Sequence, residues 1–373
     1  KHAQLAAQIL ERLEHPISPD TLIGDLRVGQ QQMIEIARNL IADDLKILIM
    51  DEPTSSLSQQ EVKILFKIMR ELLAQGISIV YISHRLEEIM EIGDHVTILR
   101  DGRYVADADV RDIDVPWIVK QMTGEGKSYP KKDRNIDWEK QETVLEVRDL
   151  TLPKSGGGYL LHHVDFNLKR GEILGIYGLM GAGRTEVFEC IMGLRPEHTG
   201  DILLEGKKME IHSISEQIER GFALVPEDRQ REGLVQTMSI LKNISLSSIK
   251  KYVKGFLLDD KLEGRRADEQ IKDIHIKVAD KNLPILSLSG GNQQKVVIGK
   301  GLLTNPKILL LDEPSRGIDI GAKTEVFDII NQYAEKGLSI IVISSELKEI
   351  IAIADRVMVL SNGIKTGELI GDE

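Results

Sequence analysis

Residues 173–187 read ILGIYGLMGAGRTEV, and this stretch decides the fold that the sequence predicts. An apolar run predicts a strand that stops at Gly178, a glycine-rich turn follows, and residues 185–193 predict a helix. Gly178 and Gly183 have the spacing of the phosphate-binding pattern G-x-x-x-x-G-K-[ST], in which Arg184 stands in place of the lysine. Backbone N–H groups in such a loop turn toward an anion at the helix N-terminus. Thr185 would then hold Mg²⁺ and Arg184 would reach the β and γ phosphates, although glycines at such a turn can also serve tight packing alone.

Length and composition limit the class of protein. A chain of 373 residues is too long for one ordinary core and suggests two domains. The hydrophobic content of 42% and the charged content of 29% are typical of a globular protein, and no apolar run approaches the length of a membrane-spanning helix. The net charge of −11 argues against a nucleic-acid-binding surface as the main function. The single cysteine, Cys190, excludes an internal disulfide.

Before the phosphate loop, the chain alternates predicted helices with apolar strands. The predicted elements are a helix over 1–13, a loop and amphipathic helix over 26–40, a buried strand over 45–50, a helix over 57–74, a buried strand over 77–83 and a hairpin over 96–105. Asp51 and Glu52 follow the first of these strands, and His84 stands at the end of the second.

The same landmarks recur later in the chain. Five pairs are each separated by 261 positions: Asp51 and Asp312, Glu52 and Glu313, Gly76 and Gly337, Asp94 and Asp355, and Gly102 and Gly363. A repeat of this length indicates two tandem copies of one α/β unit rather than a solenoid. Strands that alternate with helices favour a mainly parallel sheet covered on both faces.

The repeat also suggests how the chain is divided. The counterpart of the loop at Gly178 would lie before the first residue, so we expect the first copy to be incomplete at its N-terminus. Residues 123–142 are polar and without periodicity, which predicts a solvated linker. The expected domains are therefore the C-terminal portion of a first copy over 1–122 and a second copy over 143–373.

Two further motifs in the second copy carry chemistry. In LSLSGGNQQ, Ser289, Gly290 and Gly291 begin a predicted helix and offer a hydroxyl and unhindered N–H groups to an anion, although a plain helix cap would look the same. In ILLLDE, Asp312 and Glu313 leave a buried strand, where one carboxylate could hold Mg²⁺ and the other could orient or deprotonate a water. Paired acids at that place can also be only a helix cap and a solvated neighbour.

The order of these motifs resembles the ATP-binding cassette family over both copies. That family has four motifs in a fixed order: a phosphate loop, then LSGGNQQ, then an apolar strand with Asp-Glu-Pro, and then a strand that ends in histidine or its substitute. The resemblance implies the P-loop NTPase fold with helical and antiparallel β subdomains, and ATP and Mg²⁺ as ligands. It also implies that two units pair head to tail, with each ATP between the phosphate loop of one and the signature loop of the other.

The resemblance assigns one composite site to intact motifs. Asp51 would bind Mg²⁺, Glu52 would be the general base and His84 would contact the γ-phosphate. The second copy would contribute its signature loop, namely Ser289, Gly290, Gly291 and Asn292. The phosphate loop of this site is the one expected before the first residue.

The other composite site accumulates substitutions. It would combine the altered loop, from which Gly178, Gly181, Ala182, Gly183, Arg184 and Thr185 bind ATP, with Asp312 at the metal and Glu313 as base, and with Arg27, Val28 and Gly29 of the first copy. Arg184 replaces the lysine, Arg27 and Val28 replace a signature serine and glycine, and Ser345 replaces the histidine. Glu186 adds a negative charge to the first helical turn, and Glu227 stands where the family usually has glutamine. We expect this site to bind nucleotide or regulate, with little or no turnover.

The motifs GLMGAGRTE, VPEDR, LSGGNQQK, DEPSRGID and ISSE are similar to those in the tandem ATPase subunits of bacterial monosaccharide importers, of the ribose, galactose, xylose and autoinducer class. This similarity implies a peripheral protein at the cytoplasmic face of the membrane. Its partners would be integral-membrane permease subunits and, indirectly, an extracytoplasmic sugar-binding protein. Ser58, where the second copy has Asp319, departs from the pattern and could weaken communication between the copies.

Two alternatives remain at this point. A twin-cassette translation factor would also be duplicated, but it would need an extended basic linker to reach RNA, and residues 123–142 are short and mixed in charge. A nucleotide-binding fragment that does not hydrolyse ATP is the other alternative.

Overall fold

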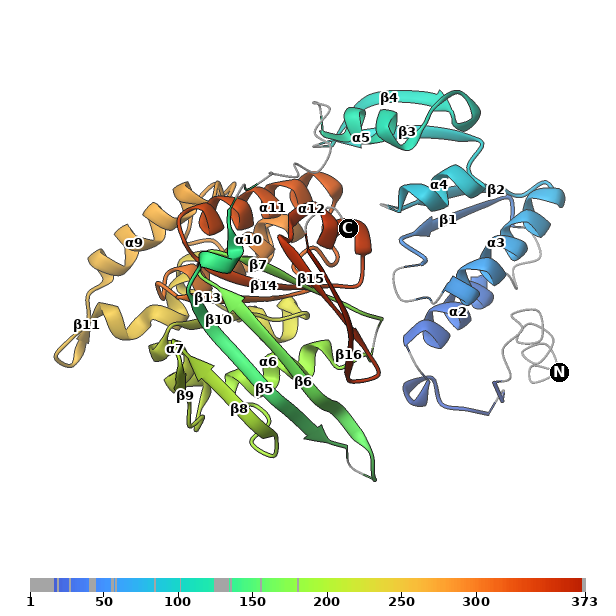
Figure 1. Cartoon of the computed structure of the whole chain (residues 1–373). Coiled ribbons are helices and arrows are strands. Elements are labelled where there is room, and N and C mark those ends of the chain that lie inside the picture. The colour runs from blue at the N-terminus through green and yellow to red at the C-terminus, as the bar shows by residue number, and fades with distance from the viewer. Residues whose placement is uncertain are drawn as a thin grey trace. The chain divides into compact units, whose positions relative to one another are not determined.

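The computed structural model describes residues 17–18, 20–26, 28–39, 45–54, 57, 59–83, 85–100, 102–123, 134, 136–154, 156–179 and 181–370. The chain divides into two compact units, residues 1–127 and 128–373, and the boundary lies within the range predicted to be a linker. Figure 1 labels the elements of both units. The predicted helix over 1–13 lies outside the described residues.

Unit 1, residues 1–127, has the alternation that the sequence predicts. Its main elements are α2 (Val28–Asn39), β1 (Ile47–Asp51), α3 (Gln59–Ala74), β2 (Ser78–Ile82), α4 (Leu86–Ile92), β3 (His95–Arg100), β4 (Arg103–Asp109) and α5 (Val115–Thr123). Strands β1 and β2 pair in parallel, with Ile47 opposite Ser78, and β3 and β4 form the predicted antiparallel hairpin. The predicted elements that fall on described residues are therefore confirmed to within a few positions.

The prediction that β1 and β2 are fully buried is wrong. One face packs on α2 and α3, where Met33 and Phe66 are almost completely buried. The alternate residues are exposed, including Ile47 at 61% and Ile49 at 67%. Among the described residues of unit 1, helices cover only one face of this pair, so the strands show the alternating burial of a half-covered sheet.

Unit 2, residues 128–373, contains two main sheets. Its strands are β5 (Thr143–Pro153), β6 (Tyr159–Lys169), β7 (Ile173–Tyr177), β8 (Thr199–Leu204), β9 (Lys207–Lys208), β10 (Phe222–Val225), β11 (Val253–Lys254), β12 (Leu257–Leu258), β13 (Ile308–Asp312), β14 (Ser339–Ser344), β15 (Arg356–Ser361) and β16 (Ile364–Ile370). Its α-helices are α6 (Arg184–Met192), α7 (Ile214–Arg220), α8 (Ile240–Ser245), α9 (Asp260–Asp273), α10 (Gly290–Leu302), α11 (Ile320–Glu335) and α12 (Leu347–Ile353).

The larger sheet is mainly parallel, as predicted. Its strand order is β10-β13-β14-β7-β15-β16, and only β16 runs antiparallel to its neighbour. The smaller sheet, in the order β6-β5-β8-β9, is antiparallel, and its long strands β5 and β6 are prominent in Figure 1. Helices α8 and α9 add a helical part to the same unit.

Both faces of the larger sheet are covered. Alternate residues of β13 and β14, such as Leu309 and Ile340, join a core cluster that includes residues of α8, α10 and α11. The residues between them, such as Leu310 and Ile341, join a second cluster that includes residues of α6 and the antiparallel sheet. Every residue of β13 and β14 is therefore buried, which matches the continuous apolar runs of the sequence.

Elements of unit 1 recur in unit 2 with the spacing seen in the sequence. Helices α3 and α11 have the same length of 16 residues, and their bounds differ by 261 positions. The same offset relates α4 to α12 and the β3–β4 hairpin to β15 and β16. Strand register is also repeated, because Ile47 faces Ser78 in β1–β2 and Ile308 faces Ser339 in β13–β14.

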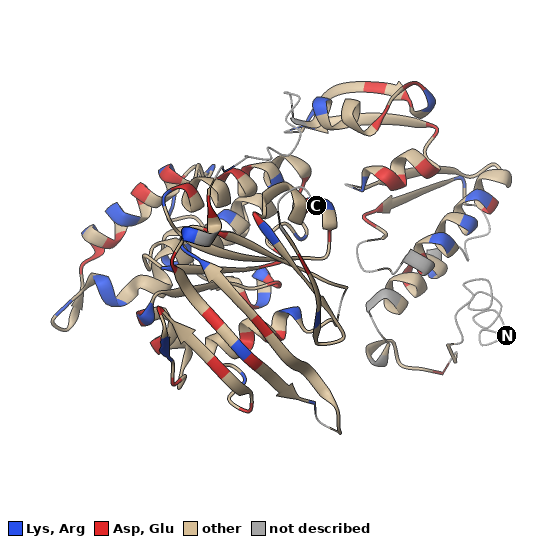
Figure 2. Cartoon of the chain, in the orientation of Figure 1, with Lys and Arg blue, Asp and Glu red and all other residues tan. Residues whose placement is uncertain are grey.

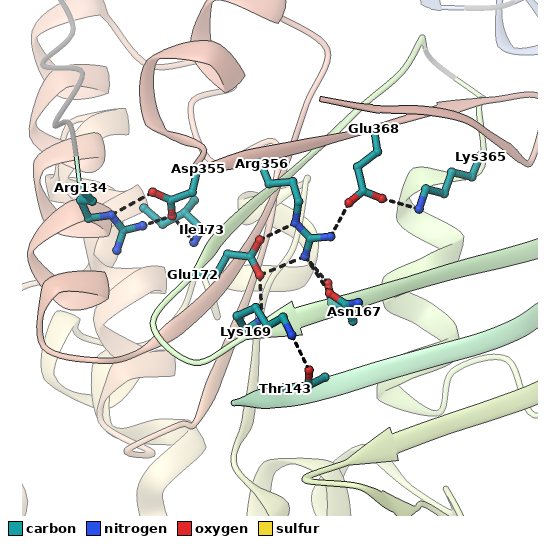
Figure 3. A network of polar contacts seen from close by, with 10 residues as sticks. All are labelled: Arg134, Thr143, Asn167, Lys169, Glu172, Ile173, Asp355, Arg356, Lys365 and Glu368. Atoms are coloured by element: carbon teal, nitrogen blue, oxygen red, sulfur yellow. Dashed lines mark hydrogen bonds and ion pairs between the residues drawn. The ribbon is translucent and has the colours of Figure 1, made fainter. Parts of the chain in front are cut away.

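A polar network fastens the first residues of β7 and β15 together. Figure 3 shows Arg356 between Glu172, at 2.6 Å, and Glu368. Asp355 accepts a hydrogen bond from the Ile173 backbone and pairs with Arg134. Arg134 lies inside the range predicted to be a solvated linker, yet its side chain is only 8% exposed. The prediction of solvation is therefore wrong at Arg134, because Asp355 gives this guanidinium a buried partner.

Charges of both signs are interspersed along α9, as Figure 2 shows. Within or next to this helix, Arg266 pairs with Glu269 and Lys281 pairs with Asp268. Glu263 of the same helix is fully buried and is bound by Lys242, at 2.6 Å, and by the Ser245 hydroxyl. The polar side of α9 is thus organised by ion pairs of opposite sign.

The Figure 3 network yields a stability prediction. Glu172 is 1% exposed and is one of the two carboxylates that pair with Arg356. Replacing it with alanine therefore leaves the buried Arg356 guanidinium with Glu368 alone as its ion-pair partner. We expect Glu172→Ala to lower the free energy of unfolding by about 3 kcal/mol, the scale for breaking a buried ion pair. The matched control is Glu142→Ala, since Glu142 pairs with Arg170 at the surface and should cost at most about 1 kcal/mol. Urea denaturation followed by circular dichroism measures both, and equal losses would contradict the prediction.

Candidate functional site

The predicted phosphate loop joins β7 to α6, and α6 begins within one residue of its predicted start. A side chain at Gly178 would place its Cβ 2.4 Å from the Leu360 oxygen, and at Gly183, where φ is +97°, 2.8 Å from the Leu160 oxygen. Gly181 is also left-handed, with φ of +78°, but a Cβ at this position would have no described residue within 4 Å beyond its chain neighbours. Tight packing therefore explains Gly178 and Gly183, whereas the only local demand on Gly181 is its backbone conformation.

The acidic pair stands at the end of β13, beside the start of α6. Asp312 and Glu313 are 2% and 7% exposed. Thr185 donates a hydrogen bond of 2.8 Å to Asp312 Oδ2, so the predicted metal-binding pair lies together. Burial, with a contribution from neighbouring Glu313, raises the pKa of Asp312 to about 6 despite this hydrogen bond.

Arg184 points to the acidic pair. Its Nη1 lies 3.0 Å from Glu313 Oε1, and both side chains are 8% exposed. Burial raises the pKa of Glu313, while Arg184 and hydrogen bonds from Ser345 oppose the rise. The sequence predicted that Arg184 reaches toward phosphate and that Glu313 activates water. In the structure each of these groups faces the other, because a buried guanidinium and a buried carboxylate stabilise one another.

Two buried atoms at this place lack a hydrogen-bond partner among the described residues. One is the donor Nη1 of Arg184. This nitrogen forms an ion pair with Glu313, but the geometry is not that of a hydrogen bond. The other is the acceptor Oδ1 of Asp312. A free donor suits a phosphate oxygen and a free carboxylate oxygen suits a hard divalent cation, so the residues fit Mg²⁺ with a nucleotide phosphate.

The signature loop begins α10, as predicted. The Ser289 side chain is exposed and makes no capping bond to the helix, so a simple capping role does not explain this serine. Gly291 packs against Ala322, with a virtual Cβ contact of 2.4 Å. Asn292, for which the sequence predicts ATP binding, accepts a hydrogen bond from Lys277 N, at 2.9 Å, and donates one to the Ser289 hydroxyl, at 3.1 Å. Asn292 thus orients the serine that the sequence singled out.

In unit 1 the acidic pair is more accessible. Asp51 is exposed and Glu52 is half-buried at the end of β1. Glu52 has a positive φ of 49°, and Glu313 has 45°, a conformation that costs a non-glycine residue about 1–3 kcal/mol. Both residues donate their N–H to the next strand, to the oxygens of Ile82 and Ile343. The two acids thus share one strained backbone conformation, which residues at functional sites often have.

The remaining predicted residues of unit 1 are described in part. Val28 and Gly29 form the first turn of α2, in the place that Gly290 and Gly291 take in α10. Arg27, His84 and Ser58 lie outside the described residues.

Arg229, for which the sequence predicts no role, joins three loops of unit 2. Arg229 opens a short π-helical turn after β10 and donates to the oxygens of Arg316, at 2.7 Å, and Gly317, at 2.9 Å. A Cβ at Gly290 would lie 2.9 Å from its Nη2. Arg316 in turn pairs with Glu227. The only signal was the motif VPEDR, since the partners are backbone atoms 87 and 88 positions away.

The strand order, the phosphate loop at the start of α6 and the acids at the end of β13 define a P-loop nucleotide-binding cassette. Two solved structures have this fold. One is a nucleotide-free ATP-binding cassette from an ABC transporter, at a TM-score of 0.55 and 21% identity over 62% of this chain and 92% of that one. The other is a dimeric bacterial ABC transporter cassette, at a TM-score of 0.54 and 24% identity over 61% of this chain and 98% of that one.

Sequence comparison gives the family. A family described as ABC transporter matches residues 161–316. The xylose import ATP-binding protein of Photobacterium profundum is 39% identical over 376 residues, which cover 100% of this chain and 73% of the relative. The ribose import ATP-binding protein of Geobacillus kaustophilus is 43% identical over 96% of this chain and 71% of the relative, and the xylose import protein of Escherichia coli K12 is 42% identical over 97% and 71%. The chain belongs to the ATP-binding proteins of ABC transporters, which are ATPases.

Among the helices of the described residues, none has both the length and the apolar composition that crossing a membrane requires.

The Thr185 and Asp312 pair yields a binding prediction. Thr185→Val removes the hydroxyl beside Asp312, and we expect the affinity for Mg²⁺ with a fluorescent ATP analogue to fall about tenfold, the scale of one charged hydrogen bond. Thr185→Ser keeps the hydroxyl and should bind like the parent. Equilibrium titration with and without EDTA measures this difference. A Thr185→Val defect that persists unchanged in EDTA would contradict a role at the cation.

Proposed function

We propose that this chain is the ATP-binding and ATP-hydrolysing subunit of a bacterial importer for a monosaccharide or similar small carbohydrate. Support for the transported class comes from the relatives, since proteins named for ribose and for xylose import match nearly the whole chain at 39–43% identity. Support for the nucleotide comes from the geometry of unit 2.

One observation carries the assignment of ATP with Mg²⁺. The loop before α6 presents a buried donor on Arg184 and, beside Thr185, a buried acceptor on Asp312, and neither atom has a hydrogen-bond partner among the described residues. Arg184 Nη1 has only its charge contact with Glu313, so a phosphate oxygen would add the hydrogen bond that it lacks, and a cation would compensate the buried Asp312 Oδ1. Bound Mg²⁺ would supply positive charge for the phosphate oxygens, held by Thr185 and Asp312.

The partners we propose are integral-membrane permease subunits and, indirectly, an extracytoplasmic sugar-binding protein. The chain would then act as a peripheral protein at the cytoplasmic face of the membrane, without a nucleic-acid partner. The names of the relatives and the motifs shared with monosaccharide importers support this placement.

An experiment with membranes tests the partner assignment. The chain is mixed with vesicles that contain the permease subunits of a ribose or xylose importer, and with vesicles that lack them. We expect it to sediment with the first kind only. Equal sedimentation with both would contradict a permease partner, and no sedimentation with either would contradict the importer assignment.

We further propose that units 1 and 2 are two copies of one cassette, with an incomplete first copy over 1–122, a linker over 123–142 and the second copy over 143–373. The repeated element bounds at an offset of 261 and the shared left-handed Glu52 and Glu313 support duplication. In this family arrangement the copies pair head to tail, so that each nucleotide is held between them.

The two nucleotide sites would then differ in chemistry. One uses Asp51 for Mg²⁺, Glu52 as general base and His84 at the γ-phosphate, opposite Ser289 to Gly291 of unit 2. Glu52 suits the task because it is half-buried at a strand end, where it can accept a proton from water while it remains accessible. Its backbone strain is held by the hydrogen bond to Ile82.

The other site, at Arg184, would bind nucleotide and regulate. The Arg184 to Glu313 contact of 3.0 Å supports this division, because a general base that is paired with a guanidinium is a weaker proton acceptor. Ser345, in the place of His84, also donates to Glu313 rather than offering an imidazole. Arg27 and Val28 would complete this site from unit 1 in place of a serine and a glycine.

Steady-state hydrolysis of Mg²⁺-ATP by the 373-residue chain tests this division. We expect the chain to bind a fluorescent ATP analogue while its turnover stays near background. We also expect Glu313→Gln to leave turnover unchanged, because Glu313 is already paired with Arg184. If the chain hydrolyses ATP and Glu313→Gln abolishes that activity, the Arg184 site is catalytic and the division is wrong. Thr185→Val serves as the control for nucleotide bound at the same loop.

A further inference from the structure

A buried glutamate in unit 2 joins two loops that the sequence analysis did not connect. Glu349, 2% exposed at the start of α12, accepts hydrogen bonds on Oε2 from the hydroxyls of Ser315 and of Ser344, the latter at 2.8 Å. Its other oxygen pairs with Lys323 at 2.8 Å, and Lys323 also reaches Glu346 at 3.0 Å. Both serines are at most 2% exposed, so water does not compete for these bonds.

Unit 1 repeats the arrangement with different side chains. Glu88, at the start of α4, accepts on Oε2 from Thr54 at 2.7 Å, from Tyr81 at 2.6 Å and from Ser83 at 3.4 Å. Its other oxygen pairs with Arg85 at 3.2 Å. Glu88, Thr54 and Ser83 lie 261 positions before Glu349, Ser315 and Ser344, so two separately folded units show the same contact.

The contacts of Glu349 span the two segments that carry the site. Ser315 is two residues after Glu313, the left-handed acid. Ser344 comes directly before Ser345, and its hydroxyl also accepts a hydrogen bond from Glu346 N at 3.0 Å, which closes a turn around position 345. Glu349 therefore holds the chain directly before position 345, which corresponds to the family's γ-phosphate contact, and the Ser344 hydroxyl holds the chain directly after it.

The same turn closes in unit 1. Ser83 accepts a hydrogen bond from Arg85 N at 3.0 Å, and Thr54 is two residues after Glu52. Position 84 stands between Ser83 and Arg85 in the sequence.

The charge of each glutamate is balanced from a different element. In unit 1 the cation is Arg85, next to the strand end, and Val62 of α3 stands where α11 has Lys323. In unit 2 the position of Arg85 is taken by Glu346, which would repel the buried carboxylate, and Lys323 supplies the cation instead. Burial lowers the pKa of Lys323, but Glu349 and Glu346 outweigh burial and hold it above its ordinary value. The cation therefore differs between the two units, Arg85 in one and Lys323 in the other, whereas the carboxylate and two of its hydroxyl donors stand at corresponding positions.

We propose that Glu88 and Glu349 are positioning residues, each of which clamps the loop after the acidic pair to the end of the next strand. The clamp fixes Glu52 relative to Ser83 and Arg85, and Glu313 relative to Ser345. This inference rests on the proposed function, because the two loops need a fixed geometry only if they form the proposed ATP sites. Neither glutamate touches nucleotide in this scheme.

Hydrogen exchange followed by mass spectrometry tests the clamp without nucleotide. In Glu349→Gln we expect the amides of Glu313, Arg316 and Glu346 to exchange about tenfold faster, since their hydrogen bonds belong to the clamped loops. The remaining amides of β13 and β14 should keep their protection. A uniform rise over these strands would show that the carboxylate only contributes to global stability, and would overturn the proposal.

Serine variants separate the clamp from packing. Ser315→Ala deletes one donor and should accelerate exchange at Arg316 and also at Glu346, across the carboxylate. Ser315→Thr copies Thr54 of unit 1 and should behave as the parent. If alanine and threonine are equivalent, the hydroxyl is not what holds the loops and the proposal fails, even where Glu349→Gln proves too unstable to study.

Glu88→Gln is the matched variant of unit 1. It should loosen the amides of Glu52 and Arg85 and leave unit 2 unchanged. Binding of the ATP analogue is measured separately for every variant. A chain that loosens as expected but binds no nucleotide contradicts the proposed function and keeps the clamp, whereas normal binding without loosening overturns the clamp alone.

Discussion

The parallel register of β7, β14 and β13 is the constraint on which the site depends. Asp312 is level with Ile343, and Ser344 is level with Tyr177, so the three strands end side by side. The residues that follow each strand then meet at one edge of the sheet, where open α/β folds bind ligands. A register shift of one residue would turn each of these side chains to the opposite face.

Burial at this edge explains the side-chain pairing around the phosphate loop. Asp312 and Glu313 are two carboxylates in a place with little water, and an isolated pair would be costly. Thr185 and Arg184 each satisfy one of them from the first turn of α6. Arg184 stands where the phosphate-binding pattern has lysine, and its longer planar group also reaches the carboxylate of Glu313.

The sequence predicted the order of elements well because apolar periodicity and loop glycines are local signals. The bounds of α6 and the hairpin of β3 and β4 followed from such signals. Side-chain partners could not be predicted in this way. Arg134 and Asp355 are 221 positions apart, and Arg229 binds backbone oxygens that any sequence would provide. The half-exposed faces of β1 and β2 were missed for a related reason, since an apolar run does not say how many layers cover it.

The two units share one buried contact, in which a glutamate accepts hydrogen bonds from hydroxyls of two loops, although the surroundings of their acidic pairs differ. Position 345 is serine where position 84 is histidine, and Arg184 is paired with Glu313, yet in both units a buried glutamate contacts the same two loops with its cation on a different element. The contact is present with either cation, Arg85 or Lys323, which indicates that the carboxylate and its hydroxyl donors set the geometry of the two loops. The loop from Ser315 to Asp319 is also held by Arg229, which packs beside Gly290 of the signature helix. Loop geometry in unit 2 is thus tied to Gly290 through Arg229, so the loop after Glu313 and the first turn of α10 can only keep their arrangement together.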